Sequence, residues 1–142
     1  MGRKSRDSRR TRVAAEPAPA PAADSGRALV ALAWAIPGGG HLWLGRRQKG
    51  VVFLLALPLM FAIGLWLEGA LAPFDPSQPL VLLAAFADLG NGVPYLIAAV
   101  AGLGQGRVVA ATFEYGNTFL IVSGLLNMLV ALDAYDVALG RK

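Results

Sequence analysis

Six polar residues stand within otherwise apolar sequence and are the first candidates for chemistry: Asp88, Asn91, Asn117, Asn127, Asp133 and Asp136. Charged groups inside a bilayer are costly and are usually functional, so these side chains could line an ion path or meet a partner. Asp133 and Asp136 share a helical face, where they could meet Arg46 or Arg47 or form a solvated helix end. Asp88 and Asn91 lie in the sequence DLGNGVP, where an Asx-turn is the simpler explanation.

The densest local pattern is PGGGHLWLGRRQKG, and its notable members are Pro37, Gly38, Gly40, His41, Trp43, Gly45, Arg46 and Gly50. Its glycines let backbones pass closely, while Trp43 and Arg46 suit the interface between lipid headgroups and water. A structural turn is the simpler interpretation, and binding of an anionic headgroup or a partner is the alternative. His41 could titrate or bind a metal, but we expect it to donate a hydrogen bond that closes the turn.

Small residues form a third pattern that is typical of helix packing in membranes. One window carries Ala98, Gly102 and Gly106 at four-residue spacing, and a later window carries Gly124 on one stripe with Asn117, Asn127 and Ala131. We expect both stripes to bring helices together, within the chain or between chains.

Several classes of function are excluded by composition. The chain has no Cys and one His, which excludes thiolate chemistry and multi-histidine metal cages. It has no phosphate-binding loop and no dinucleotide-binding fingerprint in the required context. We therefore predict a protein that is not an enzyme, with no catalytic, cofactor-binding or metal-binding residues.

The distribution of charge indicates a membrane protein. Ten of the 22 charged residues fall within residues 1–27, and uncharged windows cover 28–45, 51–67, 89–106 and 115–132. Each window is about as long as a bilayer-spanning helix. The expected fold is all-α, an integral membrane bundle of about four hydrophobic segments, in a domain covering residues 28–142.

The individual segments differ in how clearly they span. Residues 51–72 are the least ambiguous span. The window 28–45 is broken by Pro37 and three glycines, so it is either a kinked span or a re-entrant hairpin. The stretch 80–106 is interrupted at 88–94, which leaves both its crossing and the side of the C-terminus open.

Residues 1–27 are basic and then rich in Ala and Pro, so we expect a disordered cytosolic arm. This arm carries the net charge of +4, which argues against a nucleic-acid-binding fold. It could instead contact anionic lipid headgroups. With the RRQK turn it holds ten of the thirteen Lys and Arg residues, which predicts a multi-pass protein of the cell inner (plasma) membrane with a cytoplasmic N-terminus.

The turn pattern resembles the two-transmembrane (TM-two) domain family and related small bacterial membrane proteins. The shared features are G38-G39-G40-H41, Trp43, L44-G45-R46 and Gly50, and the ending from Asn127 to Ala138 resembles the close of some of these families. The resemblance implies membrane residence and no catalysed reaction.

Three functions remain open from the sequence. The first is a non-enzymatic accessory, assembly or scaffold subunit that packs against partner helices or forms a homo-oligomer. The second is a minimal oligomeric pore or transporter that uses the intramembrane Asp and Asn residues. The third is a regulator at the membrane surface whose basic arm binds lipid.

Overall fold

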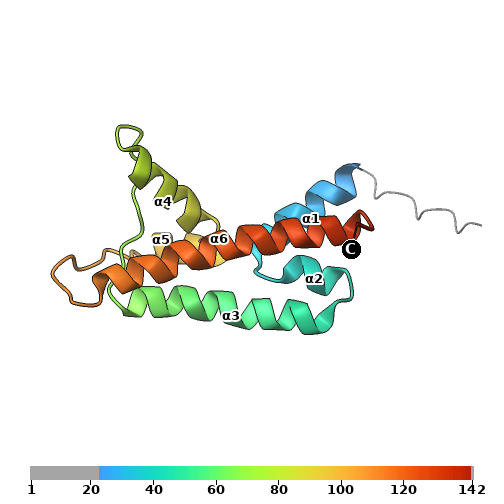
Figure 1. Ribbon diagram of the computed structural model, residues 1–142, viewed down its shortest axis with the longest axis horizontal. Coiled ribbons are helices and arrows are strands. Elements are labelled where there is room, and N and C mark those ends of the chain that lie inside the picture. The colour runs from blue at the N-terminus through green and yellow to red at the C-terminus, as the bar shows by residue number, and fades with distance from the viewer. Residues whose placement is uncertain (1–22, 142) are drawn as a thin grey trace, which may run out of the picture.

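The computed structural model describes residues 23–141, and these form six helices with no named strand (Figure 1). The helices are α1 (Ala23–Ala35), α2 (Gly39–Trp43), α3 (Arg47–Trp66), α4 (Pro79–Leu89), α5 (Val93–Val100) and α6 (Phe113–Ala138). The all-helical class agrees with the prediction. Residues 1–22 of the predicted arm lie outside the described residues, and residues 23–27 belong to α1.

Two long apolar helices, α3 and α6, run antiparallel along the length of the molecule (Figure 1). Both are long and apolar enough to cross a membrane. They approach closely because glycines face each other, and a Cβ added at Gly64 would lie 3.0 Å from the carbonyl oxygen of Gly116. A core of Phe61, Leu120 and Ala98 fills the space beside this contact.

The first apolar window turns back on itself. Helix α1 ends at Ala35, and the chain reverses through Pro37 and Gly38 into the short helix α2, so α1 starts and α2 ends at the same end of the molecule (Figure 1). Gly38 has a φ of 78°, and a Cβ there would strike the carbonyl oxygen of Gly50. Of the two interpretations of the window, the structure has the hairpin geometry.

The second interrupted segment is also bent. Helices α4 and α5 meet at an angle of 110°, across the break at residues 90–92. Among the described residues, two helices could therefore span a membrane, or three if this bent pair counts as one span. Each half of the described chain has the same order of elements, a bent pair followed by a long helix, and the long helices point in opposite directions (Figure 1).

The predicted span 51–72 is displaced toward the N-terminus. Helix α3 begins at Arg47 and ends at Trp66, and Glu68 follows with a φ of 64°. Residues 69–72 are extended and lie beside residues 104–107, with Ala70 opposite Gln105. The amide of Leu71 donates to Gly104 (2.8 Å) and that of Arg107 donates to Glu68 (3.1 Å).

The loop before α4 is held by Asp75. Its carboxylate accepts hydrogen bonds from the hydroxyl and amide of Ser77 and from the side chain of Gln78. These bonds, with the Ser77 hydroxyl contributing most, hold the pKa of Asp75 below its ordinary value. The loop is thereby ordered just before Pro79 starts the helix.

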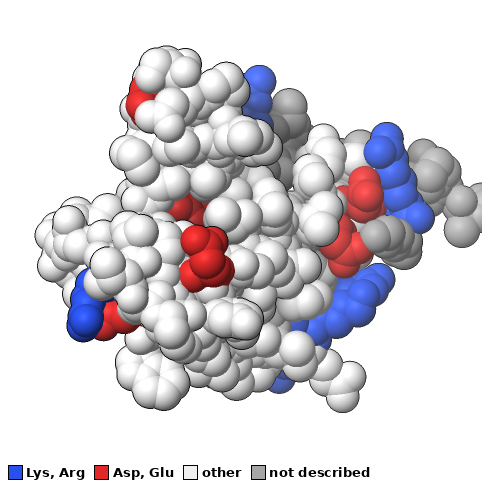
Figure 2. Space-filling model, turned by 60° about the vertical axis from the view of Figure 1, so that its left-hand side comes forward, with Lys and Arg blue, Asp and Glu red and all other residues white. Residues whose placement is uncertain are grey.

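Charge is concentrated in a few places on the surface. On the face in Figure 2 most of the surface is uncharged, and Lys and Arg atoms gather mainly on the right-hand side. That side carries the start of α1, the turn between α2 and α3, and the end of α6 (Figure 1). Asp and Glu atoms also lie near the middle of this face, and the large remaining uncharged area is typical of a surface that faces lipid.

Candidate functional site

The polar residues singled out from the sequence lie mainly along one face of α6 and the breaks packed against it. We call these residues, with Ser123 added and Asp136 left out, the polar seam, and its members are His41, Asp88, Asn91, Asn117, Ser123, Asn127 and Asp133. Five of them are buried, and the same face of α6 carries the buried small residues Gly116, Gly124, Ala131 and Ala134. The stripe predicted on this helix, including Gly124, therefore packs inside the molecule.

Asn127 joins the two bent pairs at the middle of the molecule. Its amide nitrogen donates to the carbonyl of Trp34 at the end of α1 (2.9 Å) and to that of Gly90 at the end of α4 (2.8 Å). The indole of Trp34 donates directly to the carbonyl of Leu89 (3.1 Å). Helix ends leave such carbonyls unpaired, and a broken helix at membrane depth must have them satisfied by neighbours.

Asn91 holds the bend between α4 and α5 against α6. Its amide nitrogen donates to the carbonyls of Asp88 (3.0 Å) and Leu120 (3.1 Å), and its oxygen accepts the hydroxyl of Ser123 (2.8 Å). The first bond is a local one of the kind expected for this sequence. The other two reach α6, so Asn91 both shapes the bend and fastens it.

Asp88 and Asn117 bind the extended segment 69–72 from the side opposite residues 104–107. The amide of Ala72 donates to Asp88 (2.9 Å), and the amide of Ala70 donates to Asn117 (2.8 Å). A cavity of about 370 Å³ lies beside these two side chains. The second carboxylate oxygen of Asp88 is buried without a hydrogen-bond partner among the described residues.

His41 does not close its own turn as expected. Its Nε2 lies 3.0 Å from the carboxylate of Asp133 on α6, and its ring packs edge-on against Phe53 at 5.3 Å. The histidine is fully buried and the Asp133 side chain is a quarter exposed. His41 contacts Asp133 because Gly40 lets α2 lie close to α6, so that the imidazole reaches the carboxylate.

The glycines of the turn pattern have two distinct roles. A Cβ at Gly40 would lie 2.7 Å from that of Ala33 and 2.8 Å from that of Ala134, and one at Gly50 would lie 2.6 Å from Leu42. Gly45 has open space around it but a φ of 75°. Pro37 is buried in the hairpin, while Trp43 and Arg46 are exposed.

The small residues Ala98, Gly102 and Gly106 do not form the helix-packing stripe that we expected in the window before Arg107. Helix α5 ends at Val100, and Gly102 and Gly106 lie beyond it with φ values of 69° and 66°. They serve turns of the backbone and not a helix face. Only Ala98 of that set packs in the core.

Asp136 pairs at the end of α6 with Arg141, at 3.6 Å between Oδ1 and Nη1. It is therefore separated in role from Asp133, although the two share a face. The hydrogen bonds of Ser123 to Asn91 and of the Trp34 indole to Leu89 were not identified from the sequence. The spacing of Ser123 from Asn127 and Leu120 on the α6 stripe was the available signal for the first, and no local signal marked the second.

The seam is suited to hold backbone in place. Among residues 23–141 no three His, Cys, Asp or Glu side chains are grouped so as to hold a metal ion. Five of the seven seam residues form a hydrogen bond to a main-chain atom: Asp88, Asn91, Asn117, Ser123 and Asn127. Three buried side-chain atoms have no hydrogen-bond partner among the described residues: His41 Nδ1, Asp88 Oδ1 and Asn127 Oδ1.

Comparison with known proteins identifies a family without an assigned activity. Residues 28–142 match a family of unknown function (DUF6677). No curated protein and no solved structure matches the chain.

Proposed function

Because the chain belongs to this family of unknown function, we propose its role from geometry: a non-enzymatic small integral membrane protein that acts as an accessory, assembly or scaffold subunit. The observation that carries this is the use of the polar seam. Asn91, Asn117 and Asn127 each form a hydrogen bond to a backbone atom of another segment, and this use of buried polar groups to hold the helix breaks in place supports a structural role.

The outer faces of the long helices support packing against other helices or lipid. Exposed aliphatic side chains on these helices include Val52, Leu55, Leu59, Leu129 and Leu132. Exposed apolar surface of this extent is typical of a membrane or protein contact. A partner helix or a second copy of the chain would cover one of these faces and leave the other to lipid.

The proposed location is a bacterial inner membrane with the N-terminus in the cytoplasm. The support is the clustering of Arg27, Arg46, Arg47, Lys49 and Arg141 on segments that share one end of the molecule (Figure 1). Basic residues favour the cytoplasmic side. We also propose that the turn pattern reflects a relation to TM-two domains. The N-terminal arm, in the same proposal, contacts anionic lipid.

Site-directed photo-crosslinking in cells tests the subunit role. A photoreactive residue is placed at Leu55 or Leu59 on α3 and at Leu129 or Leu132 on α6, with buried Leu120 as the matched internal control. We expect a discrete heavier product from one helix face and none from Leu120. Two differently tagged copies then distinguish a homo-oligomer from a foreign partner. Absence of any discrete product from all four exposed positions would contradict the subunit role.

A pore or transporter is the second candidate, and one observation favours it. The two bent pairs meet at Asn127, and Asp88 has an unpaired oxygen beside the cavity that it lines. Interrupted helices in corresponding positions of two halves are typical of transporter sites. Ion flux into liposomes that is lost in Asp88→Asn and kept in Asp136→Asn would support this function, whereas no flux above empty liposomes would contradict it.

A further inference from the structure

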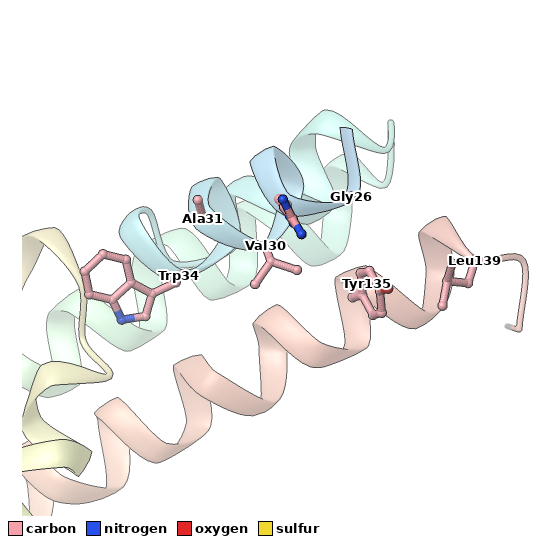
Figure 3. A pocket seen from close by; sticks show the side chains of 7 residues that line it. Gly26, Val30, Ala31, Trp34, Tyr135 and Leu139 are labelled. Atoms are coloured by element: carbon pink, nitrogen blue, oxygen red, sulfur yellow. The ribbon is translucent and has the colours of Figure 1, made fainter. Parts of the chain in front are cut away.

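A groove between α1 and the end of α6 has the shape and chemistry of a lipid site. Its volume is about 570 Å³, and it is lined by Gly26, Arg27, Val30, Ala31, Trp34, Tyr135 and Leu139 (Figure 3). Most of the lining is apolar. Gly26 faces the ring of Tyr135 across the groove, and a Cβ there would lie 3.5 Å from that ring, an ordinary contact distance.

The polar groups of the groove are at one end and the indole is at the other. Figure 3 shows Gly26 and Tyr135 toward the start of α1 and Trp34 toward its end. Arg27 follows Gly26 directly. Trp34 lies seven positions after Arg27, which corresponds to about 10 Å along the helix. This is most of one leaflet, since the whole hydrocarbon core is about 30 Å thick.

Arg27 is available to an anion. The ion pairs among the described residues use other groups: His41 with Asp133, Arg107 with Glu68 and Arg141 with Asp136. Asp136, which follows Tyr135 on α6, is thus paired with Arg141. A guanidinium at the mouth of an apolar groove suits a phosphate whose hydrocarbon lies below it.

We propose that this groove binds one acyl chain of an anionic phospholipid, with the lipid phosphate at Arg27. The acyl chain lies along Val30 and Ala31 and reaches the indole of Trp34. The hydroxyl of Tyr135 is a second donor on the opposite wall. This inference rests on the proposed membrane residence, and it concerns a site distinct from the polar seam.

Quenching of tryptophan fluorescence by brominated phospholipids tests the site in the full chain. Trp43→Phe and Trp66→Phe leave Trp34 as the single reporter, and both replaced side chains are exposed (75% and 81%). The protein is placed in bilayer discs that contain a low fraction of brominated phosphatidylglycerol or brominated phosphatidylcholine. We expect the anionic lipid to quench Trp34 several-fold more than the zwitterionic lipid at equal fraction.

Matched variants separate charge from space. Arg27→Gln should reduce quenching by the anionic lipid to the level of the zwitterionic one, while Arg47→Gln, which removes an exposed arginine at the start of α3, should leave the preference intact. Ala31→Phe fills the groove and should reduce quenching by both lipids. Equal quenching by both lipids in the parent chain, or a preference that survives Arg27→Gln, would overturn the proposal.

A second reporter distinguishes failure of the site from failure of membrane residence. A chain with Trp66 alone should be quenched equally by both lipids, because that residue lies at the outer end of α3. If Trp66 is quenched but Trp34 is not quenched by either lipid, another segment covers the groove and the proposed lipid site is wrong. If neither tryptophan is quenched, membrane residence itself is contradicted.

Discussion

Asn127 connects more of the structure than any neighbouring side chain on its helix. It is fully buried, and its two hydrogen bonds end on carbonyls of different bent pairs. Hydrogen bonds between helices in membranes contribute modestly, but a buried carbonyl left without a donor costs more. The side chain thus stabilises two chain breaks at once.

Asn127→Ala should lower the free energy of unfolding by about 1–3 kcal/mol, because two buried carbonyls lose their donor. The measurement is the melting temperature of purified protein in mild detergent. Thr118→Ala is the control on the same helix, since its hydroxyl bonds only the exposed carbonyl of Glu114. Equal melting temperatures for the two variants would show that Asn127 does not hold the breaks.

Gly45 allows backbone strain to be measured apart from crowding. Its φ is positive, yet nothing lies within 4 Å of an added Cβ. Gly45→Val should therefore destabilise the protein by about 1–2 kcal/mol through the left-handed conformation alone. Gly45→Asn should be nearly neutral, because Asn tolerates that conformation. The measurement is the melting temperature of each variant relative to the parent chain. An equal decrease for both variants would mean that crowding, and not the backbone conformation, causes the loss of stability.

At the scale of elements, helix α3 is the clearest test of membrane insertion. Leu59 lies near its middle and is 61% exposed, so its side chain faces outward from the bundle. Leu59→Arg should cost about 2.5–3.5 kcal/mol of insertion free energy. The fraction of chain recovered in membranes after carbonate extraction measures this. Gln48→Arg adds the same charge at the basic end of α3 and should insert normally; comparable recovery of both variants would place α3 outside the bilayer.

The two bent pairs show how short helices are stabilised in this fold. Neither α2, with five residues, nor α5, with eight, is long enough to cross a bilayer. Each is held by side chains of α6, through His41 and Asp133 in one case and through Asn91 and Ser123 at the start of the other. The long helix thus supplies the partners that the breaks require.

For the whole molecule, the decisive prediction is the orientation in the membrane. The chain has no cysteine, so single cysteines report without background. Gln48→Cys should react with a membrane-impermeant maleimide only in inverted vesicles, and Ser77→Cys only in intact spheroplasts. The basic turn and the loop before α4, which contains no Lys or Arg, favour these sides. Labelling of both cysteines from one side would contradict the proposed topology.

Features that depend on neighbouring residues could be predicted from the sequence. Uncharged windows predicted an all-helical membrane protein, and Pro37 with its glycines predicted the first break. Spacing along the chain placed Gly124 and Asn127 on one face of a helix. Helical periodicity and the conformational limits of Pro and Gly are local properties, which is why they could be read without the fold.

Contacts between residues far apart in the sequence became known from the packing of the helices. His41 and Asp133 are 92 positions apart, and Asn127 and Trp34 are 93 apart. The spacing of Gly102 and Gly106 suited a helix, but the chain leaves α5 at Val100 and runs beside the extended segment that follows α3. Asp88 and Asn117 accept hydrogen bonds from the backbone amides of that segment, because these amides need acceptors where water is excluded. Such pairings depend on how elements pack in space, and no local pattern of residues encodes them.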